Sequence, residues 1–425
     1  MEERMGRESK TIAVLKGQLS KFSGIISKRF TKPKQKLIKD ILYGIQASKD
    51  IKLSNIARTL KEDQALIKVE DRLSRNLDDI DFTEGINEEI VRLASSRVRD
   101  DMVIAIDPGD IRKKYGKKME YLAKIYDGSE HEVAEGYWLC KAVASDTEQK
   151  NVIPLYFEAY SQEADDFKSE NDQLSKVIEM IFKHIGNRGI HAIDRGGDRN
   201  FIYAKYLDKE EPTRFVIRLK KRNVIHRGVS KDSYDLARYL PTPHETHLVV
   251  YEDGQETRKK VTYNAVSVKH PHHRHPLYLV VVKGFGKEPM MLLTSIQVKI
   301  HKKESIWKIV EIYLTRWKCD ESYRYIKQCY NLEDIRVRSY VSIRNMVVLL
   351  LAVTYFSAVY LGQNLRLKLL VEKIFLVSKR FFGVPSFFNY AIADGIYNLL
   401  FPDKTALRQI HKKTADDFQL SFDFG

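Results

Sequence analysis

Two short apolar runs, each ending in an aspartate, constrain the fold of this 425-residue chain more than any other feature. The first run, Val103 to Ile106, leads into Asp107, and the second, residues 190–193, leads into Asp194 and a glycine-rich turn. Short apolar runs bounded by turn residues predict buried strands. Sites in α/β sheets are built at the ends of such strands. An aspartate alone is more often an N-cap or turn residue, so the runs predict an α/β fold before they predict a site.

A third acidic segment lies far along the chain. Four of its residues share one stripe of a helix at about 100° per residue: Tyr313, Arg316, Asp320 and Lys327. Glu321 falls about a quarter turn away, so this geometry favours Asp320 as the acid of the stripe. Charged residues at such spacing are most often a solvated, salt-bridged helix face. Three carboxylates in the order strand end, strand end, helix nevertheless favour a catalytic cluster.

On these residues the chain resembles the DDE transposases of bacterial insertion sequences, whose last acid lies in a Tyr-x2-Arg-x3-Glu-x6-Lys signature. Asp107 and Asp194 match the first and second catalytic aspartates of that family. Where the family has glutamate, this chain has Asp320, which is one methylene shorter and precedes Glu321. The resemblance covers roughly residues 102–344. The resemblance leaves open whether Asp320 or Glu321 is the third catalytic acid.

The resemblance implies an α/β fold with an RNase H-like core, a mixed sheet flanked by helices. It implies cut-and-paste transposition by a homodimer on double-stranded DNA, with binding of terminal inverted repeats, phosphodiester hydrolysis and strand transfer to target DNA. Carboxylates suit Mg²⁺, so two Mg²⁺ ions, with Mn²⁺ as a substitute, are expected on Asp107, Asp194 and Asp320. Glu321 is the other candidate catalytic acid. The residues expected to contact DNA are Tyr313, Arg316, Lys327, Arg195 and Arg218. For Tyr313, packing in the core is at least as common a role.

The charge distribution agrees with a DNA partner. The net charge is +15 and the isoelectric point is near 9.3, which suits a polyanion. Residues 1–60 hold 14 Lys and Arg against 5 Asp and Glu. Within them, Leu53 to Leu60 is typical of the first helix of a helix-turn-helix, and a second short helix is expected from Gln64 to Leu73. A plain helical subdomain packed on the core is the alternative interpretation.

The chain divides into five predicted parts. A helical N-terminal DNA-binding region takes residues 1–99, and the first part of the core takes 100–214. Several strand-like segments separated by turns then predict a β-rich insertion over 215–300. The catalytic helix and a packing helix follow over 301–365, and a helical C-terminal region takes 366–425.

Other residues have plainer interpretations. The run His270 to His275 lacks the spacing of a closed zinc site, so a surface or DNA-contacting turn is favoured. The three cysteines include no C-x-x-C pair, which indicates neither disulfides nor a thiolate metal site. The apolar run from Met346 to Leu361 is shorter than the ~20 residues that cross a membrane and is expected to be a buried helix. We therefore expect a cytoplasmic, nucleoid-associated bacterial protein with no membrane partner.

Two other functions are compatible with the same residues. One is a transposase-derived DNA-binding protein that no longer cleaves, with Asp320 as a mark of decay. The other is a host nuclease with an RNase H-like fold and no strand transfer. The presence of Asp107, Asp194, Arg316 and Lys327 in their expected contexts favours an active transposase.

Overall fold

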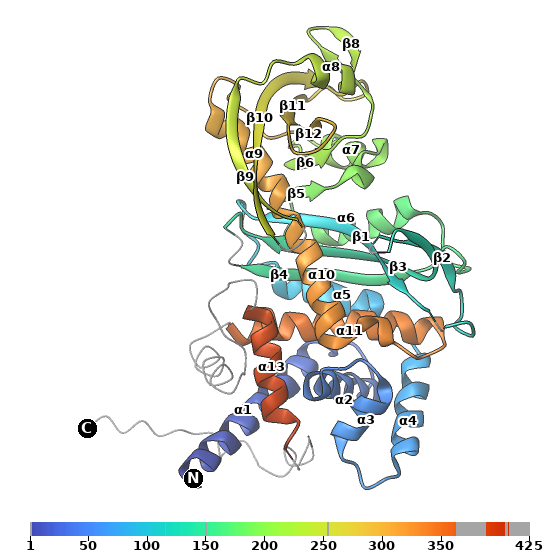
Figure 1. Cartoon of the computed structure of the whole chain (residues 1–425). Coiled ribbons are helices and arrows are strands. Elements are labelled where there is room, and N and C mark those ends of the chain that lie inside the picture. The colour runs from blue at the N-terminus through green and yellow to red at the C-terminus, as the bar shows by residue number, and fades with distance from the viewer. Residues whose placement is uncertain are drawn as a thin grey trace.

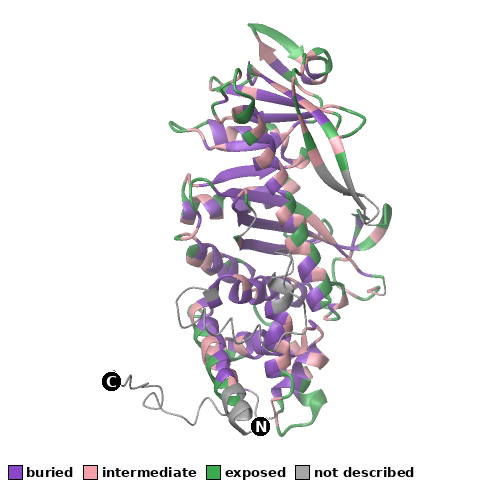
Figure 2. Cartoon of the chain, turned by 60° about the vertical axis from the view of Figure 1, so that its left-hand side comes forward, coloured by how far each residue is buried: buried purple, intermediate pink, exposed green. Residues whose placement is uncertain are grey.

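The structure is a computed structural model that describes residues 2–114, 116–128, 130–148, 151–252, 255–362, 388–403 and 407. It is a mixed α/β fold in which helices of the N-terminal region lie below one large mixed sheet (Figure 1). Buried residues form a continuous band from those helices through the middle of the sheet (Figure 2).

Twelve strands make up the sheet in the described part of the chain. They are β1 (Val103–Arg112), β2 (Ala123–Asp127), β3 (Glu132–Ser145), β4 (Val152–Tyr160), β5 (Ile190–Ile193), β6 (Phe215–Arg218), β7 (Asn223–His226), β8 (Val229–Asp232), β9 (His244–Glu252), β10 (Gln255–Lys269), β11 (Pro276–Lys283) and β12 (Met290–Thr294). The order is β2-β3-β1-β5-β6-β12-β11-β10-β7-β8, with β4 also paired to β3 and β9 to β10. The strands β1, β5 and β6 run parallel, and β3 runs antiparallel to β1.

The β-rich part continues the core sheet, which differs from the predicted insertion. β6 pairs in parallel with β5 and on its other edge pairs with β12. Residues 215–218 therefore belong with the parallel strands, and the predicted boundary at 215 separates two strands that pair. An exposed edge of β6 would leave backbone groups unpaired, and β12 supplies their partners.

The helices in the described part of the chain surround this sheet. They are α1 (Glu2–Ile26), α2 (Lys32–Ser48), α3 (Leu53–Leu60), α4 (Leu66–Asp78), α5 (Thr83–Ala94), α6 (Glu170–Ile185), α7 (Asn200–Leu207), α8 (Ser233–Tyr239), α9 (Lys303–Thr315), α10 (Trp317–Tyr330), α11 (Tyr340–Ala358) and α13 (Phe388–Leu400). Both α9 and α10 lie along one face of the sheet (Figure 1). The predicted helical region 366–425 lies mostly outside the described residues, which include its helix α13.

The helix α11 joins the N-terminal region to the sheet. It packs on β4 on one side and on α2, α4 and α5 on others. Its Asn345 accepts a hydrogen bond from the backbone N–H of Phe82 at 2.6 Å and donates to the carbonyls of Leu77 and Ile80 at 2.8 and 2.7 Å. The N-terminal helices are therefore fixed to the core, and cutting them away would expose α11.

The apolar composition of α11 has a structural cause. The helix is long and apolar enough to cross a membrane, with a mean hydropathy of 1.6 over its most apolar window. However, 83% of that window is buried within the protein. The prediction of a buried helix in this region is confirmed.

An ion-pair cluster on α5 predicts a pH dependence of stability. Glu88 accepts hydrogen bonds from Lys183 of α6 and from Arg29 after α1, each at 2.5 Å. Lys183 first and Arg29 second lower the pKa of Glu88 from 4.5 to about 2. A carboxylate with a lowered folded-state pKa stabilises the fold above its unfolded pKa and loses that contribution as the pH falls through its folded value.

We therefore expect Glu88→Gln to lower the melting temperature at pH 7. The difference in melting temperature between the variant and the wild type should narrow as the pH falls from 4.5 to 2, because the wild-type carboxylate gains its proton over that range. Thermal unfolding followed by circular dichroism measures this difference. Glu84→Gln, on the exposed side of the same helix, is the control. A difference that does not change with pH would contradict the prediction.

Candidate active site

The alternation of side chains along β1 turns its aspartate towards α10. Val103 and Ala105 pack on the side of the sheet where α9 and α10 lie, whereas Ile104 and Ile106 pack on the opposite side. Successive side chains of a strand point to opposite faces. Asp107 therefore faces α10 from the end of this apolar run, where it is 7% exposed.

β5 brings the second aspartate beside the first. Its apolar residues on the same side pack against α9. β1 and β5 are paired up to Ile106 and Ile193, so Asp107 and Asp194 follow at neighbouring positions. Asp194 Oδ1 accepts the N–H of Gly196 at 2.7 Å and begins a short 3-10 turn. Its second oxygen has no hydrogen-bond partner among the residues that the structure describes.

The third aspartate comes from α10, but the predicted helix is interrupted. α9 ends at Thr315 and α10 begins at Trp317, with Arg316 between them. The N–H of Arg316 bonds the carbonyl of Tyr313, and the N–H of Cys319 bonds the carbonyl of Arg316, both over three residues. Arg316 itself keeps helical backbone angles, φ −52° and ψ −32°. The predicted neighbours remain together across this junction, because the Arg316 guanidinium lies over the Tyr313 ring and pairs with Asp320 four residues later.

Two cationic side chains join Asp107 to Asp320. Arg316 Nη1 lies 3.0 Å from Asp107 Oδ1 and 3.3 Å from Asp320 Oδ2. Lys141 Nζ lies 3.4 Å from Asp107 Oδ2 and 3.7 Å from Asp320 Oδ1. Each cation thus bridges both acids, and together they contact all four carboxylate oxygens. We call these four residues the acid–cation ring.

Lys141 was not among the residues predicted from the sequence. It lies on β3 directly opposite Asp107 in the antiparallel pairing, and such cross-strand neighbours contact each other. Its signal in the sequence is a lone lysine within the apolar run from Leu139 to Ala144. A buried charge almost always has a partner, so this lysine implied an acid on the neighbouring strand.

Burial and charge shift the pKa values of the ring. Burial is the main cause that raises the pKa of Asp107 to about 7. Lys141 and Arg316 oppose that shift, while Asp320 and Asp194 add to it. Burial alone would lower the pKa of Lys141, but the surrounding acids raise it above its ordinary value. Both cations therefore remain charged at neutral pH.

The neighbouring acid, Glu321, points elsewhere. It forms an ion pair with Lys318 one turn earlier, and its side chain is 49% exposed. Asp320 is the one that contacts the ring cations, as the helical geometry favoured.

The residues that were predicted to contact DNA lie in different surroundings. Lys327 forms a 2.6 Å ion pair with Glu333 and is not part of the ring. Tyr313 is 2% exposed and packs in the core under α9, so as placed it is a packing residue rather than a DNA contact. Arg195 is exposed in the turn after Asp194.

Arg218 ends β6 on the face that carries the aspartates. Val216, two residues earlier, packs with α9, and side-chain alternation puts Arg218 on that side. Its Nε atom is buried and has no hydrogen-bond partner among the described residues, and the same holds for Arg316 Nε. Two guanidinium groups near the acids thus retain unused donors.

The acids fit a hard divalent ion in their chemistry. No three His, Cys, Asp or Glu side chains among the described residues stand close enough to hold a metal as they lie. However, Asp107 and Asp320 converge on positions that Arg316 and Lys141 take, and carboxylate oxygens are preferred ligands of Mg²⁺. A metal ion would therefore replace a cation in the acid–cation ring.

Comparisons with known proteins give one structural likeness to report. No protein-family model matches the sequence, and no curated protein matches it. The fold is similar to that of the piggyBac transposase in a synaptic complex with hairpin DNA, solved by cryo-electron microscopy. The identity is 11% and the TM-score is 0.42, over 94% of this chain and 80% of that chain.

Proposed function

We propose that this chain is a cut-and-paste transposase with an RNase H-like core, which binds the ends of its own DNA element and cleaves and joins DNA with divalent metal ions. The observation that carries the proposal is the meeting of three acids. Asp107 and Asp194 follow the paired segments of two neighbouring parallel strands, although β1 itself continues past Asp107 to Arg112, and α10 brings Asp320 within reach of the cations bound to Asp107. The strand arrangement, a mixed sheet flanked by helices, supports the same core.

The three aspartates would hold Mg²⁺, or Mn²⁺ in its place. Such ions activate the attacking hydroxyl group and stabilise the departing oxygen in phosphodiester cleavage. The protein's own arginines would position the DNA strand. Arg218 and Arg316 each have a buried Nε donor without a partner among the described residues, and phosphate oxygens accept such hydrogen bonds well.

The helices α3 and α4 support the recognition part of the proposal. α3 occupies the predicted Leu53–Leu60, and α4 runs from Leu66 to Asp78, longer than predicted. Val69, Leu73 and Leu77 bury one side of α4. Its other side exposes Lys68 and Arg75, which lie seven residues apart on one face. We infer that these two cations of the exposed face contact DNA phosphates.

The double variant Lys68→Gln, Arg75→Gln should therefore weaken binding to the element ends and flatten its salt dependence. If each side chain neutralises one phosphate, the slope of log K against log salt should fall by about 1.8. Fluorescence anisotropy over a salt series measures this slope. Lys205→Gln on α7 is the control. A slope equal to the wild type's would remove this face of α4 from the interface.

The wild-type protein itself tests the proposed function. It would be incubated in Mg²⁺ with a supercoiled plasmid that carries its gene with the flanking DNA, together with a second, target plasmid. We expect cuts at both ends of one segment and its joining to the target plasmid, with neither in EDTA. Binding without cleavage would favour the transposase-derived DNA-binding protein, with which the closed acid–cation ring also agrees. Cleavage without joining would indicate a nuclease.

A further inference from the structure

We propose that Lys141 is a positioning residue that holds Asp107 and Asp320 together while no metal is bound, and that leaves both acids and keeps its contact with the ring of Tyr323 when a divalent ion enters. This inference rests on the proposed function, because it gives Lys141 a role only if these acids bind a metal.

The first observation is where the ammonium group lies. Lys141 Nζ sits between one oxygen of Asp107 and one of Asp320, at 3.4 and 3.7 Å. Two carboxylates close together repel each other unless a cation lies between them. A divalent ion bound by the same two oxygens would need the same space. Lys141 and the metal therefore compete for one position.

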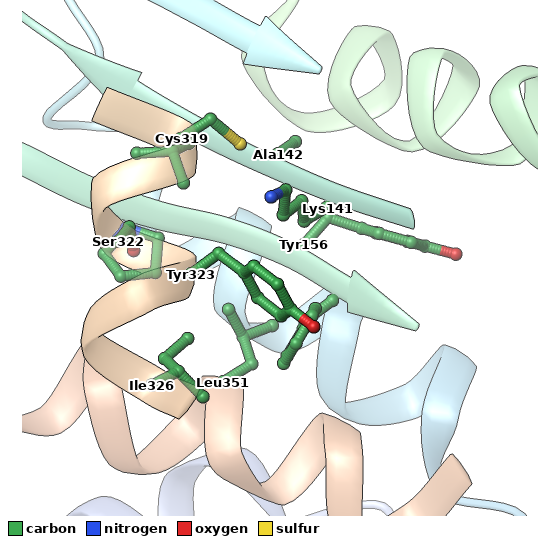
Figure 3. A pocket seen from close by; sticks show the side chains of 11 residues that line it. Lys141, Ala142, Tyr156, Cys319, Ser322, Tyr323, Ile326 and Leu351 are labelled. Atoms are coloured by element: carbon green, nitrogen blue, oxygen red, sulfur yellow. The ribbon is translucent and has the colours of Figure 1, made fainter. Parts of the chain in front are cut away.

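The second observation is that the ammonium group of Lys141 has a second partner, the ring of Tyr323. Its Nζ atom is already 4.2 Å from the centroid of the Tyr323 ring, within the range of a cation–π interaction. The lysine stem and this ring also line a cavity of about 20 Å³ beneath α10, with Cys319, Ile326 and Leu351 on its other sides (Figure 3). The flexible four-carbon stem of lysine can bend into that space without leaving the ring.

Both cations of the acid–cation ring are buried. The side chain of Arg316 is 10% exposed and that of Lys141 is 6% exposed, so a phosphate of bound DNA would not draw Lys141 outwards. Its alternative partner must be inside the protein, and the Tyr323 ring fills that role.

The competition is measured most directly by Mn²⁺ binding to the full chain without DNA. Lys141→Met keeps the length of the side chain and removes its charge, so we expect it to bind Mn²⁺ at least about tenfold more tightly than the wild type. Lys141→Arg keeps the charge and should bind no more tightly than the wild type. Lys113→Met is the matched control, because Lys113 is also buried but donates to the carbonyls of Glu333 and Ile335.

A second pair of variants tests the alternative position. Tyr323→Leu removes the ring, so Lys141 should compete more strongly and Mn²⁺ affinity should fall. Tyr323→Phe keeps the ring and should bind like the wild type. This pair decides the question if Lys141→Met does not fold, as thermal unfolding would reveal.

The outcomes separate this inference from the proposed function. Equal Mn²⁺ affinity for the wild type and folded Lys141→Met would overturn the role of Lys141. Equal affinity for Tyr323→Leu and Tyr323→Phe would overturn the role of the Tyr323 ring. If the wild type and Asp107→Asn bind Mn²⁺ equally, the acids are not metal ligands, and the proposed function fails together with the inference.

Discussion

Asp107→Asn should lower the rate of Mg²⁺-dependent cleavage by about a thousandfold or more, or ~4 kcal/mol of transition-state stabilisation. Binding to the same DNA should change little, because α3 and α4 lie below the sheet that contains β1 (Figure 1). Asn keeps the shape of Asp but offers one neutral oxygen, which is a poor metal ligand. Asp194→Asn should have the same effect, since both aspartates follow paired strands at neighbouring positions.

The fold should tolerate Asp107→Asn. Asn has nearly the size of Asp, and its amide oxygen can still accept the hydrogen bond that Arg316 Nη1 donates at this position. Circular dichroism and anisotropy on the same preparation would establish that the variant folds and binds DNA. Asp101→Asn, in the exposed loop before β1, is the control. Cleavage by Asp107→Asn near the wild-type rate would refute the assignment of the acids.

Asp320→Asn should slow DNA cleavage strongly, whereas Glu321→Gln should hardly change its rate. We expect the first to lose at least about a hundredfold in cleavage rate, or ~2.7 kcal/mol, because Asp320 shares its cations with Asp107. Glu321→Gln should stay within about twofold, less than ~0.4 kcal/mol, since Glu321 is half exposed and its ion-pair partner is Lys318 rather than a cation of the acid–cation ring.

Asp320→Glu completes the comparison. It restores the residue that the resembling family carries and should retain activity, because the longer side chain still reaches the same position from α10. The three variants are compared in one Mg²⁺ cleavage assay with DNA that contains the element ends. Loss of cleavage in Glu321→Gln together with activity in Asp320→Asn would reverse the assignment.

The sequence predicted elements whose signal is local. The strands before Asp107 and Asp194, the helix Leu53–Leu60 and the buried helix α11 each have an apolar pattern that can be read in a short window. Strand alternation also accounts for the side of the sheet on which the aspartates lie. Each of these features depends on residues that are close together in the sequence, so each can be predicted from a short segment.

Features that depend on pairing between distant segments were missed. The contact of Lys141 with the acids requires the register of β3 against β1, which no short window contains. The division into α9 and α10 at Arg316 has no Pro or Gly to mark it. The pairing of β6 with β12 joins residues 74 to 78 positions apart, so the β-rich part looked like a separate insertion.

The position of α11 affects how the protein is synthesised. α2 leaves the ribosome roughly 290 residues before α11, a delay of about 15–60 s at 5–20 residues per second. Throughout that time the apolar sides of α2, α4 and α5 lack the helix on which they pack. A chain whose synthesis stops before α11 cannot complete its N-terminal region. Under the proposed function, such a fragment would lack a finished recognition surface even when it already contains α10 and Asp320, so it could not occupy the element ends in place of the full protein.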